Sequence, residues 1–188
     1  MDTPTILIAL IVFLVLAAAL GWVFFRRQRT DKLRERFGPE YEHAMQEVGS
    51  RNEAEAELEK RQKRMEQLEI RSLSSAEREQ FNRRWKAAQA QFVDDPVGAI
   101  SDANQLVREV MAARGYPMGD FEQRAADISV DHPDVVRDYR AARKIALANE
   151  RNEADTEDLR QAMVYYRNLF KELLESLAST HNGRKELA

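Results

Sequence analysis

Residues 5–25 form an apolar run, TILIALIVFLVLAAALGWVFF, that contains no charged residue. A helix of this length reaches about 30 Å, at a rise of about 1.5 Å per residue, and this distance matches the hydrocarbon thickness of a bilayer. The run ends directly at Arg26 and Arg27. The sequence therefore predicts a transmembrane helix over residues 5–25, preceded by a short N-terminal segment of residues 1–4 outside the cytoplasm.

A cleaved signal peptide is the alternative interpretation of this run. Signal peptides carry basic residues before a shorter apolar stretch, whereas Asp2 is the only charged side chain ahead of residue 5. The one cleavage-like feature, Ala17-Ala18-Ala19, lies inside the run and is followed by Trp22, Phe24 and Phe25. Because such aromatic rings suit a membrane–water boundary, we expect a retained single-pass anchor.

The charges after the run predict the orientation. Between residues 26 and 36 there are six basic residues and two acidic ones, and none of the basic residues precedes the run. Lys and Arg accumulate on the cytoplasmic side of a membrane helix, so we expect the N-terminus outside and the rest of the chain in the cytoplasm. Four of these basic residues form a lipid-facing neck, which comprises Arg26, Arg27, Arg29 and Lys32. We interpret this neck as a topology signal, with binding of anionic headgroups as the alternative.

Composition excludes several classes of function. The chain contains no cysteine, which rules out disulfides and thiolate metal sites. Its net charge is −3 despite the basic neck, and no basic stretch with interleaved aromatic residues follows Arg36. We therefore expect no nucleic-acid partner. The roughly 150 residues beyond the apolar run are enough for one domain with a core of its own.

Apolar residues recur at spacings of three and four throughout the rest of the chain, which predicts an all-α fold. We expect a transmembrane helix followed by a stalk helix and an irregular helical bundle. The predicted segments are a basic neck with polar stalk helices at 26–72, the bundle at 73–178 and a tail without periodicity at 179–188.

Residues that cap or break helices predict the boundaries. Two capping boxes are expected, at Ser50 with Glu53 and at Ser74 with Glu77. The other expected starts are at Asp95-Pro96, Asp120, Pro133 and Asp155 or Thr156, and the expected ends are at Gly38-Pro39, Gly49 and Gly115.

Residues 51–69 allow two interpretations. Ala54, Leu58, Met65 and Leu68 follow a heptad-like spacing, but Arg61 interrupts it. A coiled coil, and with it self-association, is one interpretation. A polar stalk helix lying against the bundle is the other, and we favour it because the seam covers fewer than three heptads.

Two apolar stripes indicate the core of the bundle. The first helix is expected to carry Phe81, Trp85, Ala88 and Phe92 on one face. The last helix has the strongest pattern and is expected to be central. Its stripe consists of Leu159, Met163, Tyr166, Phe170, Leu173 and Leu177.

The most site-like segment contains Asp131, His132 and Asp134. A histidine beside a carboxylate could act as a general base. Pro133 at a first helical position, with Asp134 near the positive end of the helix dipole, explains the same residues as a helix start, and we favour this interpretation. We find no helical zinc pattern, phosphate loop or nucleophile elbow. The chain is expected to be no enzyme and to need no cofactor or metal.

Several segments together resemble a family of uncharacterised bacterial single-pass membrane proteins, known as hypothetical or putative secreted proteins. These segments are FVDDP at 92–96, MAARGYP at 111–117, DFE at 120–122, SVDHP at 129–133 and TEDLRQAM at 156–163. The resemblance implies a bacterial origin and a plasma-membrane address, and it implies no activity. The expected role is a membrane-anchored interaction, scaffold or adaptor module with an unknown protein partner. The alternative is an enzyme or ligand-binding bundle that uses the Asp131-His132-Asp134 corner.

Overall fold

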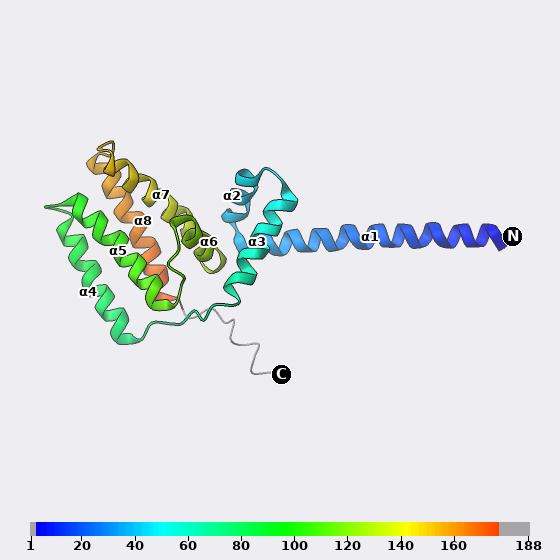
Figure 1. The fold of residues 1–188 in the computed structure, drawn as a ribbon, viewed down its shortest axis with the longest axis horizontal. Helices are drawn as coiled ribbons and strands as arrows, with labels where there is room; N and C mark the ends of the chain where they lie inside the picture. The colour runs from blue at the N-terminus through cyan, green and yellow to red at the C-terminus, as the bar shows by residue number, and fades with distance from the viewer. Residues whose placement is uncertain (1–2, 177–188) are drawn as a thin grey trace.

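The computed structural model describes residues 3–176, with side chains from Ile11 onward. The predictions for Leu177 and for the tail at 179–188 therefore lie outside the described residues. The described part is all-α, as predicted, and has eight helices and no strand (Figure 1). They are α1 (Thr3–Phe37), α2 (Pro39–Val48), α3 (Arg51–Met65), α4 (Ser75–Gln91), α5 (Pro96–Arg114), α6 (Phe121–Asp131), α7 (Pro133–Glu150) and α8 (Thr156–Glu175).

Helix α1 is one uninterrupted rod that projects from the body of the molecule (Figure 1). It is the one helix of the described chain that is long and apolar enough to cross a membrane. Its apolar side chains from Ile11 to Phe25 are exposed, whereas Leu33 and Phe37 near its end are buried in the core. The same helix therefore supplies both the apolar span and part of the folded body.

Helices α2, α3 and α6 surround the end of α1. Helix α3 packs against α1, α2 and α6. Three of the predicted seam residues, Ala54, Leu58 and Met65, are consequently buried within this chain. This packing agrees with the stalk-helix interpretation. Helix α3 ends at Met65 rather than near Glu69, and Leu68 lies in the turn that follows, partly buried against the core.

Helices α4, α5, α7 and α8 form the other half of the body. Helix α8 packs against α5 and α7, as expected for a central helix. Trp85 of α4 stacks on Phe170 of α8, with 4.6 Å between the ring centroids. Trp85 and Ala88 of the first predicted stripe are buried, while Phe81 and Phe92 are partly buried against the core.

Most of the predicted helix ends are confirmed. Ser74 and Glu77 form a capping box, and Asp95, Asp120 and Asp155 each cap a helix with the side chain. Left-handed glycines end α2 and α5, with φ of 73° at Gly49 and 96° at Gly115. The capping box predicted at Ser50 is wrong, because the Ser50 side chain makes no cap hydrogen bond.

A buried ion-pair cluster connects the two halves of the body. Glu40 of α2, which is 2% exposed, accepts hydrogen bonds from Arg61 of α3 at 2.9 Å and from Arg140 of α7 at 2.6 and 2.8 Å. Arg61, which interrupts the predicted seam, thus has a buried carboxylate partner. Contacts of this kind cross the predicted boundary between residues 72 and 73, as does the packing of α3 against α6.

Candidate functional site

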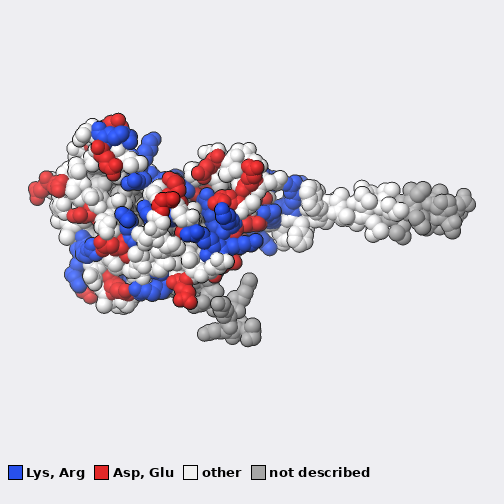
Figure 2. Space-filling model, in the orientation of Figure 1, with Lys and Arg blue, Asp and Glu red and all other residues white. Residues whose placement is uncertain are grey.

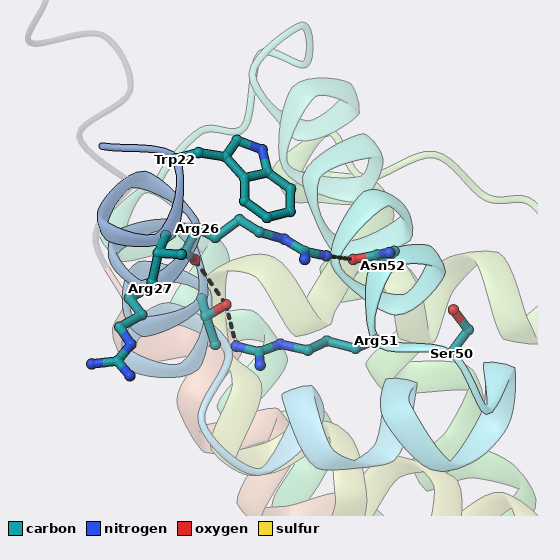
Figure 3. Close-up of a pocket in the computed structure, with 8 residues that line it drawn as sticks. Trp22, Arg26, Arg27, Ser50, Arg51 and Asn52 are labelled. Carbon is teal, nitrogen blue, oxygen red and sulfur yellow. Dashed lines mark hydrogen bonds between the residues drawn. The ribbon is translucent and has the colours of Figure 1, made fainter. Parts of the chain in front are cut away.

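A cavity of about 380 Å³ lies where α1 enters the body, between α1 and the beginning of α3 (Figure 3). Its walls come from two segments of the chain, residues 22–30 and residues 50–52. The lining residues are Trp22, Val23, Arg26, Arg27, Thr30, Ser50, Arg51 and Asn52. The cavity thus begins beside the last turn of the apolar run and extends along the basic neck.

Arg26 and Arg51 extend from opposite helices toward the space between them (Figure 3). The Arg26 guanidinium lies over the Trp22 ring, 4.8 Å from its centroid, and donates a hydrogen bond to the Asn52 side-chain oxygen. Arg51 donates to the Thr30 hydroxyl at 2.5 Å. The Arg27 side chain is turned outward at the edge of the cavity.

Glu55 holds Arg51 in place from the interior. This carboxylate is 5% exposed and accepts hydrogen bonds from Thr30 at 2.7 Å, Arg51 at 3.0 Å and Tyr41 at 3.1 Å. Burial acts to raise the pKa of Glu55, but these hydrogen bonds outweigh it and lower the pKa below its ordinary value. The ionised carboxylate offsets the charge of Arg51 and joins α1, α2 and α3.

The four predicted neck residues have three different surroundings. Arg26 and Arg27 line the cavity, whereas Arg29 forms a two-bond ion pair with Glu59 of α3, at 2.5 and 2.8 Å. Lys32 is exposed, and no described residue bonds to it. Figure 2 shows Lys and Arg gathered where α1 meets the body, next to its uncharged stretch. Because of its ion pair with Glu59, Arg29 also stabilises the packing of α1 against α3.

Arg51, Ser50 and Asn52 were missed as site residues by sequence reasoning. The pattern around Ser50 indicated only a helix start, and the bond between Arg26 and Asn52 joins residues that are 26 positions apart. Because Ser50 does not cap α3, the first amide groups of this helix have no side-chain acceptor from it. These amides add a positive electrostatic potential to the arginine-lined cavity.

The predicted corner at residues 131–134 is dispersed. The His132 Nδ1 atom lies 3.1 Å from a carboxylate oxygen of Glu172 on α8, so neither neighbouring aspartate pairs with the ring. Asp131 accepts a long hydrogen bond of 3.4 Å from the Tyr116 hydroxyl, and Asp134 is exposed. Sequence reasoning missed Glu172, because nothing local relates residues that are 40 positions apart.

His132 is 5% exposed and ends α6 where α7 begins at Pro133. Burial, followed by the charge of Arg114, lowers the pKa of His132 below its ordinary value, against the opposing effect of Glu172. The His132 Nε2 atom is buried and has no hydrogen-bond partner among the described residues. Burial within the packing of α6, α7 and α8 thus disfavours the charged form of this histidine.

Arg114 is completely buried beside this joint. Its guanidinium donates to the carbonyl oxygens of Arg71 at 3.2 Å and Leu173 at 3.0 Å, and to the Ser176 hydroxyl. These bonds connect the end of α5 with the end of α8 and with the segment that follows α3.

Within residues 3–176, no group of three or more His, Asp or Glu side chains could hold a metal ion.

A second hollow, of about 300 Å³, lies between α4 and α8 over the Trp85–Phe170 stack. Basic side chains on its walls outnumber acidic ones. It is lined by Arg78, Asn82, Trp85, Arg167, Phe170, Lys171, Leu174 and Glu175. Arg167 and Lys171 are exposed and pair with no acidic residue of the described chain. The hollow thus presents positive charge around an aromatic floor.

Comparisons with known proteins return no relative: no family model, no curated protein and no solved structure matches the chain.

Proposed function

We propose that the chain is a single-pass membrane protein whose helical body is an interaction or adaptor module on the cytoplasmic face of a bacterial plasma membrane. The observation that carries this proposal is the continuity of α1. Its exposed apolar stretch is part of the same helix as Leu33 and Phe37, which are buried in the body. An apolar span of this length is stabilised by a bilayer and is costly to leave in water.

The basic neck supports the proposed orientation. Arg27 and Lys32 have no acidic partner among the described residues, and the apolar stretch precedes both. Unpaired basic residues at one end of a span favour the cytoplasmic side for that end.

The hollow between α4 and α8 supports an interaction role. Arg167 and Lys171 provide charge without an internal partner, and the Trp85–Phe170 stack provides an apolar floor. Aromatic residues and arginine are enriched in protein-binding surfaces. The fitting partner is an acidic segment of a cytoplasmic protein.

Two reporter fusions test the orientation. Alkaline phosphatase, which is active only outside the cytoplasm, should be inactive when fused after Ala188, and green fluorescent protein at the same position should fluoresce. An active phosphatase fusion would refute the cytoplasmic placement. Resistance of the full-length protein to alkaline carbonate extraction tests membrane insertion itself.

In-cell crosslinking followed by purification of the full-length protein tests the interaction role. Arg167→Glu combined with Lys171→Glu should reduce recovery of the partner, because it reverses the charge of the hollow. Lys144→Glu on α7 is the matched control, since Lys144 is exposed and pairs with no described residue. Equal recovery from both variants and from an anchor-only chain of residues 1–29 would overturn the proposal.

A further inference from the structure

We infer that the cavity between α1 and α3 binds the phosphate of an anionic phospholipid headgroup. This inference rests on the proposed insertion of α1 into a membrane and goes beyond it. Insertion alone requires only an apolar span and a topology signal, whereas a headgroup site requires that particular groups converge on one phosphate.

The charge of the cavity favours an anion. Three arginines line it, and none of the described residues on its walls is acidic. Arg51 is offset by Glu55, but Arg26 has only the neutral Asn52 as a hydrogen-bond acceptor, and Arg27 has no bonded partner in the described chain. Guanidinium groups bind phosphate oxygens through paired, charge-assisted hydrogen bonds. Arg26, which faces the cavity, is therefore the main residue that holds the phosphate, and Arg27, which is turned outward at the edge in this structure, joins it when its exposed side chain rotates inward.

The start of α3 adds a second kind of donor. Ser50, Arg51 and Asn52 belong both to the cavity wall and to the uncapped beginning of this helix. A phosphate in the cavity accepts hydrogen bonds from the amide groups that Ser50 leaves without a side-chain acceptor. The uncapped start of α3 and the Arg26 side chain thus line the same cavity.

The position of the cavity along α1 identifies the lipid as the source of the phosphate. Trp22 and Val23 form its apolar wall within the last turn of the apolar run, and Arg26 follows one turn later. When residues 5–25 span the bilayer, this arrangement places the tryptophan at the boundary and the arginine at the level of the phosphates. A free phosphate would leave this apolar wall unused.

Native mass spectrometry of the full-length protein in neutral detergent tests the inference. The protein is titrated with phosphatidylglycerol or with phosphatidylcholine of the same acyl chains, and bound lipid is counted. We expect each protein to bind one phosphatidylglycerol molecule, in clear preference to phosphatidylcholine. Arg26→Gln combined with Arg27→Gln should weaken this binding about twentyfold or more, at about fivefold per basic residue.

Lys32→Gln is the matched control. It removes one positive charge from the same neck, but Lys32 is outside the cavity and about 10 Å further along the helix than Phe25, at the helical rise of about 1.5 Å per residue. Its effect should stay below about twofold, because a Debye length at physiological salt is about 8 Å. Equal losses per charge from Lys32→Gln and from the arginine variant would show a diffuse attraction and overturn the site.

Two further outcomes separate the alternatives. Displacement of the lipid by an equal concentration of glycerol 3-phosphate would identify a soluble phosphate ester as the ligand and overturn the lipid assignment. Full-length protein that resists carbonate extraction but binds both lipids equally refutes this inference alone. Protein that is released by carbonate refutes the proposed membrane function as well.

Discussion

Arg140 of α7 donates hydrogen bonds to both carboxylate oxygens of Glu40 of α2, which stands 100 positions earlier in the chain. Arg61 of α3 adds a third hydrogen bond to the same carboxylate. Glu40 immediately follows the Gly38-Pro39 break that ends α1. The ion-pair cluster therefore connects the base of the apolar helix to the half of the body that is furthest from it in sequence.

Replacing Glu40 by Gln should destabilise the protein by about 3 kcal/mol, because it leaves the largely buried Arg140 guanidinium without a counter-charge and leaves Arg61 with only the more exposed Glu57, at 3.3 Å. Denaturant unfolding of the full-length protein in detergent, followed by near-ultraviolet circular dichroism, measures the loss. Glu42→Gln on the same helix is the control. Its 63% exposed side chain pairs with Arg34 at 3.4 Å, so the expected cost is at most about 0.5 kcal/mol. Equal costs would contradict the structural role of the cluster.

Gly115→Ala should cost more stability than Gly49→Ala. Both glycines have left-handed φ, which costs a residue with a side chain about 1–2 kcal/mol. A Cβ at residue 115 would in addition lie 2.7 Å from the backbone oxygen of Glu69, whereas a Cβ at residue 49 meets no atom within 4 Å. The difference between the two unfolding free energies measures the clash, and identical values would argue against the close approach of residue 69 to the end of α5.

Protein stability should fall as the pH is lowered below about 6.5, the ordinary pKa of histidine. Because burial lowers the pKa of His132 in the folded state, the unfolded state binds more protons than the folded state at pH values between the two pKa values. Acidification through this range therefore lowers the free energy of unfolding. His132→Gln should flatten the dependence of the unfolding free energy between pH 7.5 and 5.5. Glu172→Gln should steepen it, since this carboxylate opposes the shift. An unchanged slope in the His132→Gln variant would show that another group titrates.

A chain that ends at Leu169 should not fold its body, whereas a chain that ends at Ser176 should. The shorter chain lacks Phe170, Leu173 and Leu174, all buried, and the acceptors that Leu173 and Ser176 provide for Arg114. The longer chain keeps every buried residue of α8. Limited proteolysis of the two proteins distinguishes them, and a protease-resistant body in the shorter chain would contradict a central role for α8.

Local signals predicted much of this fold. Caps at Ser74, Asp95 and Asp120 and the glycines at 49 and 115 lie within a few residues of the helix ends that they predicted. These signals work because a cap satisfies amides of its own first turn and a left-handed glycine satisfies carbonyls of its own last turn. The predicted cap is absent at Ser50, which lines a cavity together with residues of α1.

The contacts that define the candidate sites could not be predicted in this way. Glu172 pairs with His132, and Asn52 pairs with Arg26, across separations that carry no periodic pattern. Arg61 offered a partial signal, because a charge within an apolar seam requires a partner. Its partner Glu40 is on a different helix, 21 positions away, and only the packing of α2 against α3 brings the two together.

The absence of a break in α1 before Phe37 has a mechanical consequence. Without a hinge between the apolar stretch and the body, any tilt or axial rotation of the apolar stretch is transmitted to the body as a rigid movement. At 3.6 residues per turn, inserting one residue between Phe25 and Arg26 would turn the body by about 100° around the helix axis without changing the apolar stretch. Under the proposed insertion, the register of α1 thus determines the direction within the membrane plane toward which each side of the body faces.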